Sequence, residues 1–151
     1  ARRRPVLLVD ADPGPGGLTA RFGVGAAAGL YDALAADELQ PDRLVVATEL
    51  ERLALLGPGA PRADLLELLA RRRTLDLLRT LLGADPARLI LIDGPPLSRP
   101  EGQALALFAG QVLLVVAAGA TRRDALESAL ARLGEQADVS LLLNRAPVTS
   151  S

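Results

Sequence analysis

The sequence contains no cysteine and no histidine. These absences exclude disulfides, thiol catalysis, serine–histidine and cysteine–histidine triads, and ordinary zinc sites. The sequence also lacks lysine, so its 17 basic residues are all arginine. Because a phosphate-binding P-loop needs a lysine beside its glycines, these 151 residues carry no complete P-loop. With only two Phe, one Tyr and no Trp, the core must be aliphatic.

Length and charge narrow the class of protein. At 151 residues the sequence predicts a single domain over residues 1–147, with a loose tail at 148–151. The net charge of -1 gives no electrostatic case for binding nucleic acid. Three arginine clusters, at residues 2–4, 71–73 and 122–123, are typical of solvated faces, with an anionic ligand or lipid as the alternative. No signal peptide is visible, because the first cluster precedes only a short apolar run.

Short apolar runs alternate with helical patterns along the chain. The runs predict strands at Val6–Val9, Leu44–Ala47, Leu53–Leu56, Leu89–Ile92, Val112–Val116 and Val139–Leu143. Helices are predicted at Gly29–Ala36 and Asp64–Leu82, and a third helix begins at Thr121, whose side chain would form a capping box with Asp124. This alternation predicts an α/β fold in which helices flank a parallel sheet through right-handed crossovers.

One uncharged segment, Gly102–Thr121, is long enough to cross a bilayer. Its glycines and glutamines favour a different interpretation, in which a short helix is followed by a glycine break and a strand.

Three aspartates lie at the carboxyl ends of predicted strands: Asp10, Asp12 and Asp93. In open α/β sheets, ligands bind at that edge. Carboxylates placed there can hold hydrated Mg2+ and orient a nucleophile for phosphoryl transfer. The alternative is that each aspartate simply caps the turn that follows it. Taken together, the two acidic strand ends favour the site.

The glycine-rich stretch Gly14–Gly17 is predicted to be a turn. It does not complete a dinucleotide fingerprint, because Thr19 stands where a glycine is required. Pro15 also removes a backbone N–H that a phosphate cradle would use.

Longer stretches carry a specific resemblance. In chain order they are Val6–Asp12, Arg21–Val24, Gly29–Leu34, Leu53–Gly59 with Leu65–Leu69, Leu89–Pro96, Gly110–Thr121 and Leu142–Asn144. This ordered set resembles the bacterial tyrosine kinases of exopolysaccharide synthesis, the CpsD/CapB-like branch of the ParA/MinD P-loop ATPases. Within that branch the chain is most similar to the exosortase (XrtA)-associated tyrosine autokinases.

The resemblance implies roles for particular residues. Asp10 and Asp12 would serve Mg2+ and the substrate hydroxyl, and Asp93 would be the Walker B carboxylate that acts on Mg2+ or water. Asp12 and Asp93 would be the metal ligands. Asn144 would contact the adenine base, with Arg145 beside it in the nucleotide site. The implied cofactors are ATP and Mg2+.

The resemblance also implies a setting. The family phosphorylates tyrosines on its own tail and couples this to polymer assembly. The expected partner is a membrane-anchored polysaccharide chain-length or co-polymerase protein, and self-association stays open. No nucleic-acid partner is expected. The expected location is the cytoplasm, with peripheral attachment to the inner membrane through the partner.

The chain departs from the family pattern in several places. Residues Ala1–Pro5 resemble the last turn of the helix after the P-loop, so the first strand and the P-loop are not among these residues. The basic residues that follow the acidic motif in the family are replaced by Gly14 and Pro15, and Tyr31 is the only tyrosine. Without its central strand the sheet would expose unpaired inner edges. The strands would then close up, receive a strand from another chain, or belong to a longer gene product.

These observations leave three functional hypotheses. The first is a tyrosine kinase-like ATPase domain of exopolysaccharide biosynthesis or export, inactive as this isolated chain. The second is a pseudo-ATPase that regulates or scaffolds a polysaccharide machine. The third is a ParA/MinD-like partitioning or membrane-positioning ATPase.

Overall fold

The computed structural model describes residues 4–24, 28–38, 40–70, 72–83, 85–135 and 137–147. Its contacts divide the chain into two compact units, Ala1–Pro95 and Pro96–Ser151. The single domain predicted over residues 1–147 stays a prediction, because a division by contacts does not say whether the units fold separately. The tail at 148–151 lies outside the described residues.

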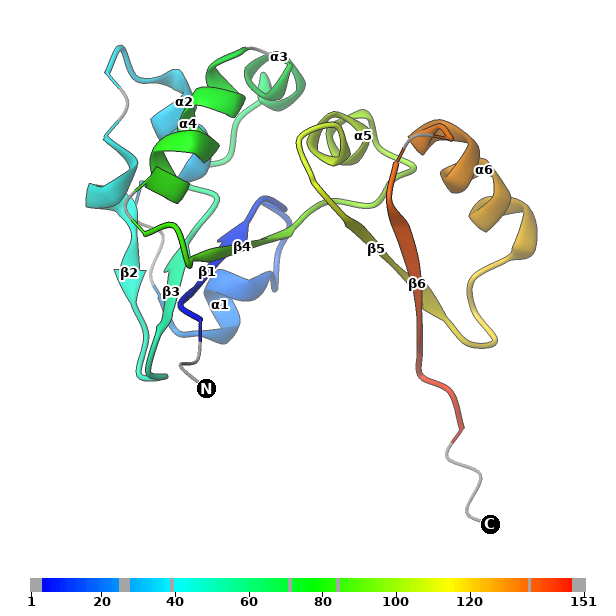
Figure 1. The fold of residues 1–151 in the computed structure, drawn as a ribbon. Coiled ribbons are helices and arrows are strands. Elements are labelled where there is room, and N and C mark those ends of the chain that lie inside the picture. Colours follow the sequence, from blue (N-terminus) through cyan, green and yellow to red (C-terminus); the bar gives the residue numbers. More distant parts are fainter. Residues whose placement is uncertain are drawn as a thin grey trace. The chain divides into compact units, whose positions relative to one another are not determined.

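The first unit is built on a four-stranded sheet with the order β2-β3-β1-β4 (Figure 1). Its strands are β1 (Val6–Asp10), β2 (Val46–Ala47), β3 (Leu53–Leu56) and β4 (Leu89–Asp93). β1 lies in the middle and pairs in parallel with both β3 and β4, whereas β2 runs antiparallel to β3. The parallel arrangement follows from continuous apolar runs, which suit strands buried on both faces.

The strand predicted at Leu44–Ala47 is wrong in its first half. The short 3-10 helix η1 (Pro41–Leu44) occupies that position, and only Val46–Ala47 pair as a strand. Pro41 stands at the start of this turn, where its fixed φ suits a helical residue and its missing N–H costs no hydrogen bond.

Four helices accompany this sheet: α1 (Leu18–Arg21), α2 (Leu30–Ala35), α3 (Leu65–Leu69) and α4 (Arg72–Gly83). Figure 1 shows α2, α3 and α4 grouped together and apart from α1. The single helix predicted over Asp64–Leu82 is wrong, because α3 ends before α4 begins. The buried Thr74 hydroxyl shares its proton between the carbonyls of Leu68 and Leu69, at 3.2 and 3.1 Å, and so provides a donor at the end of α3.

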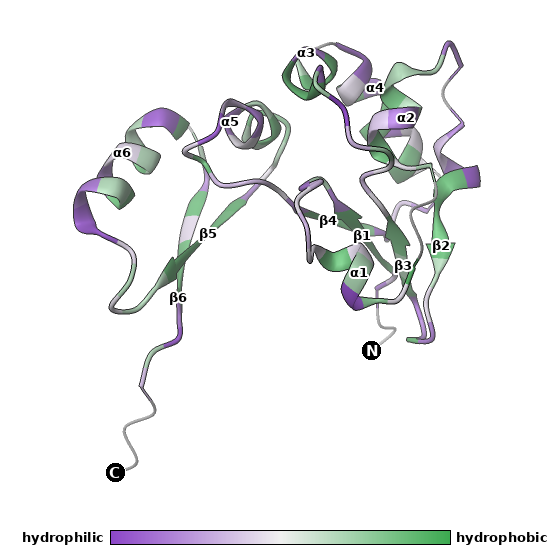
Figure 2. Cartoon of the chain, turned by 180° about the vertical axis from the view of Figure 1, so that it is seen from behind, coloured by the Kyte–Doolittle hydropathy of each residue, from purple (hydrophilic) through white to green (hydrophobic). Residues whose placement is uncertain are grey.

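The core of this unit is aliphatic, as the composition predicts. Strands β1 and β3 contribute four fully buried apolar side chains, and the helices supply most of the others. Figure 2 shows the apolar character of these strands and helices along the backbone. The buried leucines and valine are Leu7, Val9, Leu30, Leu34, Leu55, Leu56, Leu65, Leu68, Leu69, Leu77, Leu78 and Leu81. This packing holds the carboxyl ends of the central strands in place.

The second unit contains α5 (Pro100–Ala106), β5 (Val112–Ala117), α6 (Arg123–Leu133) and β6 (Val139–Asn144). β5 and β6 pair in parallel, so the predicted α/β pattern holds in this unit too. The segment Gly102–Thr121 forms the predicted helix, break and strand. Within the described ranges, no helix has the length and apolar character needed to cross a membrane.

The capping box predicted for α6 is wrong. The helix is preceded by Arg122, which makes no side-chain cap. The Thr121 hydroxyl instead accepts a hydrogen bond of 2.9 Å from the amide of Ala117. Asp124 is engaged by Arg122, whose guanidinium donates twice to its carboxylate at 3.0 Å. Because a nearby guanidinium offers a charged partner, the carboxylate does not reach back to the helix start.

Each of the two sheets has two edge strands. Among the described strands, β2 and β4 are the edges of the first sheet, and β5 and β6 are the edges of the second. Apolar side chains on β4 and β5 are half exposed: Leu91 is 51% and Leu113 is 53% accessible. Strands of parallel sheets are normally covered on both faces, so this exposure is unusual for strands of this kind. The unpaired inner edges expected from the sequence stay a prediction.

Candidate functional site

Strand register places two of the predicted acids side by side. β1 and β4 pair in parallel over five residues, with Asp10 opposite Asp93. Parallel strands end at the same edge of a sheet, so both carboxylates lie at the carboxyl edge, and Asp12 follows two residues after Asp10. Beyond the strands, the amide of Ala11 donates to the Asp93 carbonyl at 2.8 Å. The first unit therefore brings the three predicted acids together.

Asp10 is buried and its carboxylate is occupied by the protein itself. It is only 1% exposed. One oxygen accepts hydrogen bonds from the amide and the hydroxyl of Thr19, at 2.9 and 2.7 Å. The other oxygen accepts a longer bond of 3.3 Å from the amide of Asp12. Asp10 thus ties the end of β1 to the start of α1, which is the turn-stabilising role that the sequence left as the alternative. Its catalytic role stays a prediction.

Asp12 is half-buried and begins the loop that leads to α1. Its Oδ1 accepts a hydrogen bond of 3.1 Å from the amide of Gly14, the side-chain turn that aspartate commonly forms. The Gly14–Gly17 stretch is a turn, as predicted. Gly17 precedes α1, and a Cβ there would lie 3.1 Å from an Asp10 oxygen, a tight contact that a larger residue could make only if the carboxylate shifted.

Asp93 differs from Asp10, because it is exposed at the end of β4. Partial desolvation raises the pKa of its carboxyl above the ordinary value, and the charges of Asp10 and Asp12 raise it further. Arg21, the last residue of α1, acts in the opposite direction and lowers this pKa. A carboxylate crowded by two others is electrostatically suited to receive a cation.

The donor set fits Mg2+ but not a triphosphate. Mg2+ takes one or two protein carboxylates and completes its shell with water and phosphate oxygens, so two carboxylates such as Asp12 and Asp93 would be enough to hold it. Within the described part of the chain, no group of three or more acidic side chains is arranged to hold a metal ion by itself. The turn at Gly14–Gly17 contains Pro15 and no lysine, so it offers no phosphate cradle.

The predicted base-contacting residues belong to the second unit and are described separately. Asn144 ends β6 and Arg145 follows it, and both are exposed. The Asn144 side-chain oxygen accepts a hydrogen bond of 2.8 Å from the amide of Arg145. Arg145 has a φ of 58°, in the left-handed region that costs a non-glycine residue energy. Their roles in binding a nucleotide stay predictions.

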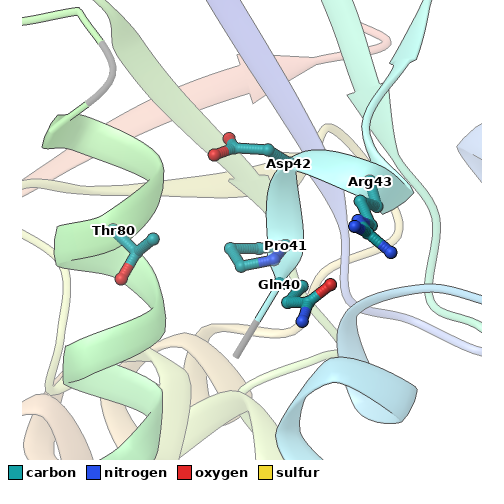
Figure 3. A pocket seen from close by; sticks show the side chains of 5 residues that line it. All are labelled: Gln40, Pro41, Asp42, Arg43 and Thr80. Atoms are coloured by element: carbon teal, nitrogen blue, oxygen red, sulfur yellow. The ribbon is translucent and has the colours of Figure 1, made fainter. Parts of the chain in front are cut away.

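An open hollow of about 340 Å³ lies elsewhere in the first unit (Figure 3). Its walls come from η1 with the residue before it and from α4, through Gln40, Pro41, Asp42, Arg43 and Thr80. Figure 3 shows the Asp42 and Arg43 side chains pointing in different directions. None of the three acids lines this hollow, so it is not part of the candidate site.

Sequence reasoning missed two residues that build the site, Thr19 and Tyr31. Thr19 holds Asp10, and the buried Tyr31 hydroxyl donates to the Ala11 carbonyl at 2.8 Å. Both lie in stretches whose local pattern indicates only a turn or a helix. Each is a polar residue in the first turn of a helix, and from that position a side chain can reach back to the end of a strand. That placement was the feature of the sequence that could have indicated them.

Comparison with known proteins identifies the fold. Protein-family models and curated proteins gave no match. Among solved structures, the VpsO kinase domain is 29% identical with a TM-score of 0.81, covering 95% of this chain and 71% of that domain. The BceF tyrosine kinase domain is 26% identical with a TM-score of 0.80, over 95% of this chain and 57% of that one. A ParA family ATPase from Chlorobium tepidum is 18% identical, with a TM-score of 0.65 over 97% of this chain and 63% of its own.

These likenesses confirm the resemblance to bacterial tyrosine kinase domains that the sequence predicts. They also confirm an α/β fold of the P-loop ATPase type, since the ParA likeness concerns the fold alone. The chain spans 71% of the length of the VpsO kinase domain and 57% of the length of the BceF domain.

Proposed function

We propose that this chain is the magnesium-binding part of a tyrosine kinase-like ATPase domain that serves exopolysaccharide biosynthesis or export. The observation that supports this most strongly is the pairing of Asp10 with Asp93 at the carboxyl ends of β1 and β4, with Asp12 beside them. The likeness to the VpsO kinase domain supports a kinase-like role for these three aspartates. Bound Mg2+ would neutralise phosphate charge during transfer.

The isolated 151-residue chain should have little or no kinase activity. A P-loop contributes backbone amides and a lysine, which together provide much of the electrostatic stabilisation of phosphoryl transfer. The unpaired edge of β4 supports this proposal, because a further strand could pair with it. We propose that a strand–loop–helix unit with the P-loop is supplied from outside the described residues.

The proposal extends to the setting of the protein. The domain would act in the cytoplasm, at the inner membrane, beside a membrane-anchored polysaccharide co-polymerase. By the family resemblance, Asn144 and Arg145 would contact the base of ATP. Asp12 and Asp93 would hold Mg2+. Self-association of the domain is part of this proposal, since the kinase family phosphorylates its own tail.

A fusion protein tests the function. The strand, P-loop and helix of a bacterial tyrosine kinase are joined before Ala1, and release of phosphate from radiolabelled ATP is measured. We expect Mg2+-dependent hydrolysis that falls by at least tenfold in the Asp12→Asn and Asp93→Asn variants. A fusion with the P-loop lysine replaced by methionine is the matched negative control. Activity that both aspartate variants retain in full would refute the assigned roles.

A pseudo-ATPase scaffold is the second candidate function. The occupied carboxylate of Asp10 and the absence of lysine favour it. It predicts that the fusion folds and binds no Mg-ATP in calorimetry. Binding by the fusion, or ATP turnover by the chain without any addition, would exclude it.

A further inference from the structure

The only tyrosine in the chain, Tyr31, is fully buried. It is the second residue of α2, and its phenol oxygen donates a hydrogen bond of 2.8 Å to the carbonyl of Ala11. Ala11 is itself completely buried, so water cannot replace this bond. The tyrosine therefore connects α2 to residues 10–14, the turn after β1 that carries Asp10 and Asp12 and is here called the acidic turn. The two ends of this bond lie twenty residues apart in the sequence.

The peptide groups around Ala11 are held on both sides. The Ala11 amide donates to the Asp93 carbonyl at 2.8 Å, while the Ala11 carbonyl accepts from Tyr31. Ala11 stands between Asp10 and Asp12 in the sequence. Its backbone contacts thus fix the position at which β1 ends beside β4. They also fix the position of the following residue, Asp12.

The start of α2 is anchored in turn, so Tyr31 has a rigid base. The amides of Leu30 and Tyr31 donate to the carbonyls of residues 57 and 58, at 2.8 and 3.0 Å. The Asp32 carboxylate accepts from the amides of Gly29 and Ala60, at 2.8 and 3.3 Å. A Cβ on Gly29 would overlap the backbone of residue 57, which shows how closely the helix start approaches this loop.

We propose that Tyr31 is a positioning residue for the acidic turn, and that its hydroxyl is therefore not a phosphate acceptor in the folded chain. It acts through the Ala11 carbonyl and sets the spacing of Asp12 and Asp93. The catalytic meaning of this inference rests on the proposed function. The contacts themselves, from Tyr31 through the Ala11 carbonyl to Asp12 (here called the clamp), are a property of the fold.

Amide hydrogen exchange measured by NMR on the purified chain tests the clamp. In Tyr31→Phe we expect the amides of Asp12 and Gly14 to exchange about tenfold faster than in the unmodified chain, beyond any acceleration shared by the whole unit. A tenfold change corresponds to the loss of about one hydrogen bond. The matched control is Thr74→Val, which removes another buried hydroxyl of the same unit, away from the acids. Equal effects of the two variants on these amides would overturn the proposal.

A second measurement covers a Tyr31→Phe chain that fails to fold. Because the chain has one tyrosine, biosynthetic 3-fluorotyrosine labels this position alone and keeps the hydroxyl. The more acidic phenol is a stronger donor, so exchange at Asp12 and Gly14 should slow while Thr74 and its neighbours are unaffected. Unchanged exchange at the acidic turn would overturn the clamp.

Binding of Mn2+, used alone as a probe for Mg2+, connects the clamp to the site. Its paramagnetic broadening of the amide signals near Asp12 and Asp93 should need several-fold more metal in Tyr31→Phe than in Thr74→Val. If the unmodified chain shows no Mn2+ binding, the proposed function loses support, while the exchange result still decides the clamp. Equal Mn2+ affinity in the two variants would overturn the positioning role.

Discussion

Replacing Asp93 by asparagine should stabilise the first unit at neutral pH. The folded state raises the pKa of this carboxyl, through partial desolvation and then through the charges of Asp10 and Asp12. The charged form is therefore less favourable in the folded chain than in the unfolded one. No hydrogen bond or ion pair within the described residues engages the Asp93 side chain, so asparagine removes the repulsion without breaking a contact.

The size of the gain follows from the exposure of the side chain. Asp93 is exposed, so solvent screens much of the repulsion. Exposed charge pairs are worth at most about 1 kcal/mol, and we expect the gain at pH 7 to lie below that. The melting temperature should therefore rise by no more than a few degrees, less than the ~4–8 °C that 1 kcal/mol gives a unit of this size. Such a gain is consistent with a residue kept for binding rather than for stability.

The gain must depend on pH in one direction. The folded chain binds the Asp93 proton more tightly than the unfolded chain does. The penalty is therefore present at pH 7 and disappears as the pH falls through the raised pKa toward the ordinary value of 3.8. Asp93→Asn and the unmodified chain should become equally stable at about pH 3.

Urea denaturation followed by tyrosine fluorescence measures this, because Tyr31 is buried in the first unit and is the only tyrosine. Glu51→Gln is the control, since it removes a carboxylate whose side chain is 92% exposed in the same unit. A destabilised Asp93→Asn at pH 7, or a gain that persists at low pH, would refute the electrostatic reasoning. Millimolar Mg2+ should narrow the difference, because a bound cation stabilises the unmodified chain.

Two further substitutions test the supports of the acidic turn by the same denaturation assay. Gly29→Ala should destabilise the unit by at least about 2 kcal/mol, because the new methyl group would overlap the backbone of Gly57. Gly83→Ala, where a Cβ meets nothing within 4 Å, should be neutral or slightly stabilising, and similar effects at both glycines would contradict the model of a close approach. Thr19→Val should cost about 1–3 kcal/mol, because the buried Asp10 carboxylate loses its shortest hydrogen bond; an unchanged midpoint would show that this bond is dispensable.

Much of the sheet could be predicted from the sequence, because its strands are apolar runs that end at Asp, Asn or Gly–Pro. Val6–Val9, Leu53–Leu56 and Leu89–Ile92 all fall within observed strands. The two-residue strand β2 could not be assigned correctly, since its pairing depends on a neighbour and not on any period of its own.

The helices were harder to delimit. The break between α3 and α4 is not marked by glycine or proline, and both sides are rich in leucine, a strong helix former. The Thr74 hydroxyl donates to a carbonyl at the end of α3, and local helix propensity does not predict this contact. At α6, a charged neighbour and the Ala117 amide took the two groups that a capping box would have used.

The candidate site shows the same limit at the level of single residues. The sequence around an aspartate at a strand end is the same whether its carboxylate binds a metal ion or accepts a hydrogen bond in a turn. Asp10 and Asp93 differ in the groups that surround them in the fold. Thr19 approaches Asp10 from nine residues away, whereas no donor from the described ranges reaches the Asp93 carboxylate. The sequence could therefore predict that the acids meet, but not which of them remains available to a cation.

The unpaired edge of β4 and the lack of lysine are separate observations, and the proposed strand–loop–helix unit would account for both. A strand that covers β4 would place its own carboxyl end beside Asp93, where a loop and a helix start could supply backbone amides and a lysine to phosphate. The half-exposed Leu91 would then be buried, which contributes about 1–2 kcal/mol of hydrophobic stabilisation. Completion of the sheet and completion of the nucleotide site would thus be the same event, so stability and Mg-ATP binding should rise together when that element is supplied.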